Sequence, residues 1–182
     1  MKTDITQVLV EEHKLILRMI ALLEKNATET AAGRYCNWQF YLDGIDFIRN
    51  YADRYHHAKE EEVLFKALVH NGMPRENSPV AAMLLEHDQG RAHVRALAAA
   101  IQDAQSGKTD ASRTIADNAL AYASLLREHI FKEDNILYPL SERVLPETVR
   151  DGIRRGYGAA EAAVSPDFSE RYRAAVARYE QE

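Results

Sequence analysis

A histidine, followed four residues later by a glutamate and then by three bulky apolar residues, occurs twice in this chain. The first copy is His56 and Glu60 before Val63-Leu64-Phe65, and the second is His129 and Glu133 before Ile136-Leu137-Tyr138. A shift of 73 positions superposes the two copies, including Lys59 on Lys132. Residues four apart lie on the same face of an α-helix, so each pair can offer a nitrogen and an oxygen to one metal ion. The repeat therefore predicts helices that carry a site for two metal ions.

Helical periodicity runs through most of the chain, and patterns typical of strands are almost absent. We therefore expect an all-α fold. Four long helices are expected at residues 4–27, 37–70 and 79–106, and after Thr109-Asp110 as far as about Val144. Asn71-Gly72-Met73-Pro74 ends the second helix, Ser78-Pro79 starts the third, and Pro139 is expected to kink the fourth or to end it early. Long helices with short connections predict an antiparallel up-down four-helix bundle.

The C-terminal region is expected to be helical but separate from the bundle. Residues 149–164 contain Gly152, Gly156 and Gly158, which favour a short and irregular helix. Ser165-Pro166-Asp167 then starts a last amphipathic helix that runs to about Tyr179. The chain is thus divided into a bundle at residues 1–145 and a helical extension at residues 146–182. We expect the extension to pack on the bundle or on a second subunit of a homo-oligomer.

Composition excludes several classes of partner. The formal net charge is -5 and there is no basic tract, which argues against nucleic acid as the main partner. No apolar stretch approaches the roughly 20 residues that cross a bilayer, and the N-terminus lacks the apolar core of a secretory signal. Cys36 is the single cysteine, which excludes an internal disulfide and fits a reducing compartment. We therefore expect a cytoplasmic protein with no membrane partner.

Helical geometry tests the metal hypothesis, because ligands inside a bundle must lie on apolar faces. At about 100° per residue, His129 and Glu133 share a face with apolar residues, and so do His56 and Glu60. The stripe of the fourth helix is Ile115, Tyr122, Leu126, Ile136, Leu140 and Val144, and that of the second is Leu42, Ile45, Ala52, Val63 and Ala67. The competing pair His57 and Glu61 is rotated towards polar residues. His57, His70 and His93 are therefore expected at the surface.

The first and third helices each add one histidine to an inward face. His13 lies on a stripe with Ile5, Leu9, Ile16, Ile20 and Leu23, and His87 on one with Val80, Met83, Leu84, Val94, Ala98 and Ile101. A single inward histidine is more often a hydrogen-bonded core residue, and a single glutamate is more often exposed or in a salt bridge. The coincidence of four histidines and two glutamates on inward faces favours metal binding. The predicted metal ligands are His13, His56, Glu60, His87, His129 and Glu133.

These six residues, in this order and spacing, resemble the signature of the hemerythrin-like family, also called HHE cation-binding domains. The flanking Lys-Glu-Glu-Glu-Val-Leu-Phe, Glu86-His87-Asp88 and Ile-Leu-Tyr-Pro are also similar to that family. The resemblance implies a four-helix bundle with a non-haem di-iron centre. It further implies that Glu60 and Glu133 bridge the two irons, with an oxo or hydroxo group as a third bridge.

One position departs from the oxygen-carrying hemerythrins, which have a further histidine one turn after the histidine of the third helix. This chain has Arg91 there. Arginine stays protonated and cannot be a ligand. It can pair with a bridging glutamate, hydrogen-bond an iron-bound anion, or reach solvent. The lost histidine is expected to leave one iron with an additional open position, which argues against simple oxygen carriage.

Tyr122 lies one turn before Leu126 on the predicted inward face of the fourth helix. A tyrosine beside two irons can donate a hydrogen bond or bind iron directly. Tyrosines in helical bundles more often pack through their rings, and we favour packing.

Two classes of function follow from a site of this kind. The first is a binding or sensing module that takes up oxygen, nitric oxide or iron. The second is an enzyme that acts on peroxide or nitric oxide, or an iron donor for damaged clusters. Imidazole and carboxylate ligands suit iron, manganese or zinc, and the resemblance implies iron. We expect a small diatomic or peroxide ligand, and the sequence identifies no electron donor.

Overall fold

The computed structural model describes residues 4–108 and 110–182, and within these ranges it contains helices and no strand. The elements are α1 (Gln7–Ala31), α2 (Trp38–Phe47), η1 (Ile48–His57), η2 (Glu60–Leu64), α3 (Phe65–His70), α4 (Pro79–Gln105), α5 (Ala111–Lys132), η3 (Glu133–Leu137), α6 (Tyr138–Val144), α7 (Glu147–Ala162) and α8 (Phe168–Glu180). The all-α prediction is confirmed. Thr109, which was expected just before the fourth helix, lies outside the described residues.

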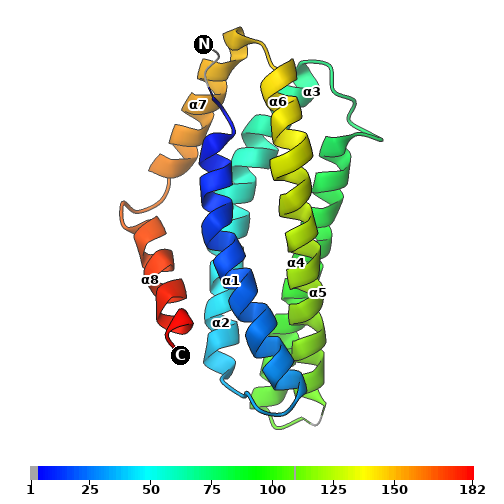
Figure 1. Cartoon of the computed structure of the whole chain (residues 1–182), viewed down its shortest axis with the longest axis vertical. Helices are drawn as coiled ribbons and strands as arrows, with labels where there is room; N and C mark the ends of the chain where they lie inside the picture. Colours follow the sequence, from blue (N-terminus) through cyan, green and yellow to red (C-terminus); the bar gives the residue numbers. More distant parts are fainter. Residues whose placement is uncertain (1–3, 109) are drawn as a thin grey trace.

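Four rods run along the long axis of the molecule (Figure 1). Two are the single helices α1 and α4, and the other two are the composite rods α2–η1–η2–α3 and α5–η3–α6. Two of the rods, those that begin with α2 and α4, start with a side-chain cap, since the side chains of Asn37 and Ser78 accept hydrogen bonds from the amides of Phe40 and Ala81. Gly107 ends the third rod with a positive φ of 75°.

Three segments of the composite rods are π-helical, namely η1, η2 and η3. The segments η2 and η3 are related by the same shift of 73 positions as the sequence repeat. A π-turn holds more residues than an α-turn, so it moves every later side chain around the helix. Pro139 does not cause the π-segment η3, because the matching π-segment η2 forms in the first copy, which has Lys66 at the position of Pro139. The fourth rod continues through Pro139 into α6, so the predicted early end is wrong.

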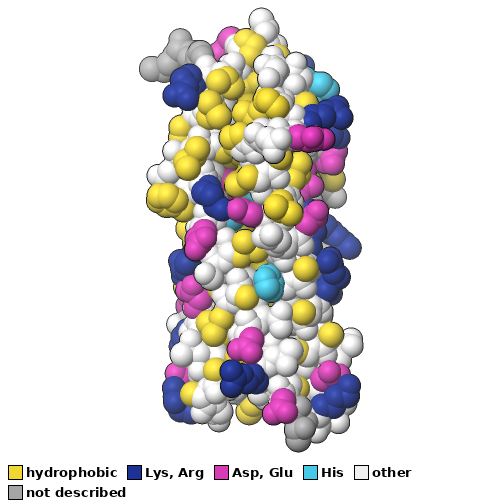
Figure 2. Space-filling view, turned by 90° about the vertical axis from the view of Figure 1, so that its right-hand side faces the viewer, with side chains coloured by type: hydrophobic (Ala, Val, Ile, Leu, Met, Phe, Trp, Pro, Cys, Tyr) yellow, Lys and Arg dark blue, Asp and Glu magenta, His cyan; other side chains and the backbone are white. Residues whose placement is uncertain are grey.

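The π-segments explain an error in the predicted inward faces. Ile136 and Val144 were expected inside but are 55% and 47% exposed, whereas Leu137 and Tyr138 are each only 1% exposed. Leu84 was also expected inside and is exposed, but it lies on α4, which has no π-segment, so this error has another origin. Figure 2 shows apolar side chains gathered towards the upper end of one face of the molecule. A count at 100° per residue does not hold across a π-turn.

The extension at residues 146–182 contains two regular helices. The segment predicted to be short and irregular forms the continuous helix α7, so that prediction is wrong. Gly156 faces Val63 of η2, where a Cβ would lie only 2.8 Å from Val63 Cγ1. This glycine therefore permits close contact between α7 and the bundle. Helix α8 packs beside α1 and α2, where the Tyr172 hydroxyl donates to Asp46 and the Tyr179 hydroxyl to Asp43.

The buried apolar residues form two clusters that meet at the inner histidines. On α1, His13 lies between Leu9, which belongs to the cluster around Leu64 and Tyr138, and Ile16, which belongs to the other. The polar centre is therefore enclosed by packed apolar layers above and below. In the part of the chain described, no helix combines the length and apolar character needed to span a membrane.

Replacing Gly156 with alanine should destabilise the protein. The added methyl group would overlap Val63, and overpacking of this kind costs about 1–3 kcal/mol. Urea unfolding would measure the change in the free energy of unfolding. Gly158→Ala is the matched control, because nothing lies within 4 Å of its Cβ position; it should be neutral or slightly stabilising. Equal effects of the two variants would contradict the close contact with Val63.

Candidate metal centre

The six side chains predicted to bind metal come together in the middle of the bundle. His13, on α1, places Nε2 3.3 Å from Glu133 Oε2, and His129 Nε2 lies 3.2 Å from Glu133 Oε1. His56 Nε2 and His87 Nε2 lie 3.6 Å and 3.5 Å from Glu60 Oε2. All six are at most 2% exposed. The helices thus bring four imidazoles around two carboxylates, beyond the reach of bulk water.

Each inner histidine uses its Nδ1 to hold a carboxylate. The pairs are His13 with Asp134 at 2.8 Å, His56 with Glu12 at 2.9 Å, His87 with Glu61 at 2.7 Å and His129 with Glu86 at 3.0 Å. An ionised carboxylate only accepts hydrogen bonds, so Nδ1 donates. In the neutral imidazole this leaves the lone pair on Nε2, which faces the two central glutamates.

The four carboxylates close a ring around the bundle. Each one precedes or follows an inner residue of its own helix and holds the histidine of the next helix. Glu12 joins α1 to η1, Glu61 joins η2 to α4, Glu86 joins α4 to α5, and Asp134 joins η3 to α1. The ring fixes the register of all four rods at the level of the histidines. The sequence contained a signal for it, because each of these acids is adjacent to a predicted ligand.

The lysines of the repeat support this ring. Lys59 is fully buried and donates to Glu12, the carboxylate that holds His56. Lys132 donates to Glu86, which holds His129. Each copy therefore has a histidine, its carboxylate partner on another helix, and a lysine that neutralises this carboxylate. The sequence repeat contained both lysines, but their role needed the neighbouring helices.

His57 was expected at the surface, and this prediction is wrong. It is 7% exposed, and its ring stacks on His87 with centroids 3.7 Å apart. The π-segment η1 brings it inward, because the wider turn places His57 closer to the face of His56 than an α-helix would. Its Nδ1 lies 3.3 Å from Asp53 Oδ1, so it is oriented like the other histidines. The remaining two histidines differ, since His70 is exposed and His93 lies half-buried beside Asn118.

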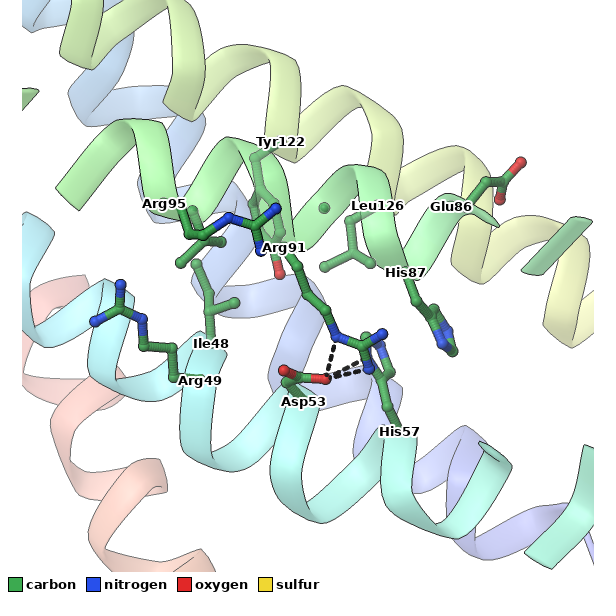
Figure 3. Close-up of a pocket in the computed structure, with 12 residues that line it drawn as sticks. Ile48, Arg49, Asp53, His57, Glu86, His87, Arg91, Arg95, Tyr122 and Leu126 are labelled. Carbon is green, nitrogen blue, oxygen red and sulfur yellow. Dashed lines mark hydrogen bonds and ion pairs between the residues drawn. The ribbon is translucent and has the colours of Figure 1, made fainter. Parts of the chain in front are cut away.

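Arg91 does not pair with either central glutamate. Its guanidinium donates to Asp53 at 2.7 Å and to Glu61 at 2.6 Å (Figure 3 shows the contact with Asp53). These two carboxylates hold His57 and His87, so Arg91 acts on the histidines through their acidic partners. Burial alone would raise the pKa of Glu61, but hydrogen bonds from His87 and Arg91 lower it to about 2. The same kind of contact, from His57 and Arg91, holds the pKa of Asp53 far below its usual value.

The two tyrosines nearest the centre have different roles. Tyr122 is 3% exposed, and its ring lies beside Gly90 at the wall of a cavity. No hydrogen bond joins it to the six inner residues in the described part of the chain. Tyr138, which the sequence did not single out, donates its hydroxyl to Glu60 Oε1 at 2.6 Å. The matching residue in the first copy is Phe65, which has no hydroxyl to donate.

The centre consists of two matching halves, one from Glu12, His13, His56 and Glu60 and the other from Glu86, His87, His129 and Glu133. The two halves have the same residue types at matching positions but different surroundings. A shift of 74 positions superposes Glu12 and His13 on Glu86 and His87, beside the shift of 73 within the repeat. At the positions matching His57, Asp53 and Arg91, however, the other half has Ile130, Leu126 and Leu17. The polar residues His57, Asp53 and Arg91 therefore have only apolar counterparts in the other half of the repeat.

The chain itself leaves much of the charge at the centre uncompensated. Burial and the nearby Glu133 carboxylate raise the pKa of Glu60 well above its usual value. Burial opposes the charging of His13, but the hydrogen bond to Asp134 and the nearby Glu133 carboxylate raise its pKa to about 9. Among the described residues, four buried atoms at the centre have no hydrogen-bond partner: His56 Nε2, Glu60 Oε2 and both carboxylate oxygens of Glu133. Unsatisfied buried polar atoms of this kind need a partner that protein atoms do not supply.

Comparison with known proteins agrees with this geometry. The hemerythrin HHE cation-binding domain matches residues 4–141, which include all six inner residues. The chain belongs to this family. Similar proteins include one uncharacterized protein of Mycobacterium bovis and two of Mycobacterium tuberculosis strains, each 23% identical over 160 residues. The match covers 84% of this hemerythrin-family chain but only 62% of each relative. No solved structure matches the chain.

Membership in this family identifies the chain as a metal-binding module, and the family's metal is typically iron. The residues present fit such a group. Imidazole nitrogens and carboxylate oxygens are ligands for iron, and the unpartnered atoms all point to the same enclosed space. A cation there would neutralise two carboxylates that the protein leaves buried.

Replacing Lys59 with methionine should strongly destabilise the metal-free protein. The change leaves Glu12 buried without its cation, and breaking a buried ion pair costs about 3–5 kcal/mol. Lys66→Met is the matched control, because Lys66 pairs with Glu62 at the surface of the same rod; its effect should stay below about 1 kcal/mol. Urea unfolding in the presence of a chelator measures both variants. A loss for Lys59→Met no larger than that of the control would contradict the support role of Lys59.

Proposed function

We propose that this chain holds two iron ions in a non-haem di-iron centre, and that oxygen, nitric oxide or peroxide binds or reacts there. The observation that carries this proposal is a pair of ligand groups that share Glu60. The first group is His13, His56, Glu60 and Glu133, and the second is His57, Glu60, His87 and His129. Within each group the ligand atoms lie within 4.8 Å of one another.

Both glutamates are placed to serve the two positions together. Glu60 belongs to both groups, and Glu133 Oε1 lies 3.2 Å from His129 Nε2 in the second group. Glu60 and Glu133 would therefore each hold both ions, and the remaining ligands would be two histidines at the first position and three at the second. Oxygen-carrying hemerythrins have a further histidine at the position of Arg91. In this proposal His57 takes the place of that histidine as a ligand of the second position.

The residues of the chain prepare the centre before any metal arrives. The ring of carboxylates holds each imidazole with its Nε2 lone pair towards the metal position. Tyr138 donates to Glu60 and so restrains one bridge. Apolar layers above and below exclude water. Iron, when bound, supplies the reversible ligand binding or the one-electron chemistry that none of these side chains has.

The surroundings give a small ligand a route to the centre from the side of the second position, while the first position, with two histidines rather than three, would keep room for a further ligand. His57 and His87 line a cavity that opens beside Arg91 (Figure 3), whereas Ile16, Ala52 and Ile130 pack beside His13 and His56. The alternative function, an iron-binding or sensing module or an iron donor for cluster repair, requires iron without turnover. Donation requires release, and ligands held by a ring of buried hydrogen bonds oppose fast release.

Anaerobic titration should load two equivalents of iron. Metal analysis after gel filtration measures the stoichiometry, and thermal unfolding should show stabilisation that a chelator reverses, because metal binds only the folded chain. His87→Ala should reduce the content below two, while His70→Ala, at an exposed position, should leave it unchanged. A wild-type protein that retains no iron under these conditions would sink the proposed function.

Exposure of the loaded protein to oxygen, nitric oxide and hydrogen peroxide in separate experiments then distinguishes the classes. Sustained consumption of peroxide or nitric oxide identifies an enzyme. A stable adduct that reverses on removal of the gas identifies a carrier or sensor. Absence of any spectral change with all three ligands would contradict small-molecule chemistry and favour iron binding alone.

Replacing Glu86 with glutamine should weaken metal binding without removing a ligand. The amide cannot hold His129 Nδ1–H as the carboxylate does and loses the ion pair with Lys132. Loss of such a supporting group typically lowers metal affinity by about 10- to 100-fold. Competition with a chromogenic chelator measures the affinity. Glu128→Gln, at an exposed position of α5 next to His129, is the control. Equal affinities of the two variants would contradict the role of the ring.

A further inference from the structure

A cavity of about 180 Å³ lies beside the second metal position. His57 and His87 lie at one end of it, Arg49 lies at the other end, and the Arg95 guanidinium lies beside Tyr122 between them (Figure 3). The wall between them is apolar and consists of Ile48, Val94 and Leu126 together with Gly90 and the ring of Tyr122. The cavity thus joins an arginine pair to the centre along an apolar path.

The volume is larger than a diatomic ligand needs. One water molecule requires roughly 10–15 Å³ by the same kind of measure. Gly90 contributes to this space from the middle of α4, where glycine disfavours the helix by about 1 kcal/mol relative to alanine. A Cβ at this position would contact the Tyr122 ring at 3.5 Å. The cavity therefore has room for an organic molecule of several heavy atoms.

The charges around the cavity favour an anion. Asp53 and Glu86 also line it, but Asp53 is paired with Arg91, and Glu86 with Lys132. Arg49 and Arg95 are exposed, and across residues 4–108 and 110–182 neither has an ion-pair partner. Two guanidinium groups without acidic partners suit a carboxylate, which accepts from the planar donor array of arginine.

The Tyr122 hydroxyl is a polar group that points into the cavity. Tyr122 is 3% exposed, and Figure 3 shows its hydroxyl directed towards Arg91 and Asp53. No described residue forms a hydrogen bond with it. Burial and the nearby Asp53 carboxylate raise the pKa of this phenol, so it keeps its proton and remains a donor. A donor that faces the cavity without a protein partner is placed to meet an oxygen atom of a ligand.

We propose that this cavity binds a small organic carboxylate with an apolar body and an oxygen function at its far end. The exposed side chains of Arg49 and Arg95 turn towards the carboxylate and hold it, the body lies against Ile48, Val94 and Leu126, and the far oxygen accepts from Tyr122. The far end then lies beside His57 and His87. The carboxylate site is independent of metal, whereas the position of the far end next to iron rests on the proposed function.

Binding to the metal-free protein tests the carboxylate site. Acetate, butyrate, hexanoate and 6-hydroxyhexanoate would be titrated into isotope-labelled protein, with 1-hexanol as the neutral analogue, and amide shifts would be followed. Affinity should rise about three- to four-fold per methylene from acetate to hexanoate. Hexanoate should bind at least about ten-fold more tightly than 1-hexanol, and 6-hydroxyhexanoate more tightly than hexanoate.

Three variants assign these differences to residues. Arg49→Gln combined with Arg95→Gln should reduce the preference for hexanoate over 1-hexanol to about two-fold or less. Tyr122→Phe should abolish the preference for 6-hydroxyhexanoate over hexanoate. Gly90→Leu should prevent the binding of hexanoate and of 6-hydroxyhexanoate. Arg54→Gln, an exposed arginine of the same π-segment outside the cavity, should behave as wild type. Absence of saturable binding, or a preference for carboxylate that survives loss of both arginines, would overturn the proposal.

Protein loaded with paramagnetic Mn²⁺ tests the orientation. The protons next to the hydroxyl of bound 6-hydroxyhexanoate should broaden more than those next to its carboxylate. The reverse pattern would overturn the proposed orientation. Carboxylate binding by a protein that retains no metal would overturn the di-iron centre but support the carboxylate site. Retention of two metal ions without carboxylate binding would overturn the carboxylate site but support the metal centre.

Discussion

Two carboxylates, Glu60 and Glu133, lie fully buried at the centre of this bundle, and most other contacts of the centre compensate for them. Burial of a charge is costly unless it is paired. Around these two the chain places four imidazoles, then four carboxylates on the imidazoles, then Lys59, Lys132 and Arg91 on three of those carboxylates. Each shell orients or neutralises the one inside it, because the outer carboxylates hold the imidazoles and the cations neutralise the outer carboxylates. What the protein does not supply is a partner for the innermost atoms.

The same pattern explains why the two halves can be alike in ligands and unlike in chemistry. The π-segments η2 and η3 repeat at a spacing of 73 positions, and the histidines and their acids repeat at 73 or 74. The longer π-segment η1 occurs in one half only and brings His57 inward. Asp53 and Arg91 then line that side, where the other half has Leu126 and Leu17. A symmetric set of ligands thereby acquires one accessible side.

The sequence predicted the fold class and the six inner residues because both depend on spacing along single helices. It did not predict His57, Leu137 or Tyr138 inside, because the prediction assumed 100° per residue through segments that are π-helical. It also gave no role to Lys59 or Glu12, although both stood beside predicted ligands. Their contact joins residues 47 positions apart on different helices. Such a role depends on which helices are neighbours, and periodicity does not contain that information.

The extension beyond the family match also contributes to the centre. Lys59 donates to Glu161 of α7 at 3.0 Å as well as to Glu12, which holds His56. Gly156 allows α7 to approach η2, and the Tyr157 hydroxyl is buried there. The family match ends at residue 141, yet α7 reaches the shell of charges that orients a histidine. A bundle without α7 would keep every inner histidine and glutamate but would expose Lys59 to water, which would weaken its hold on Glu12. The centre of this chain is therefore built by the bundle and α7 together.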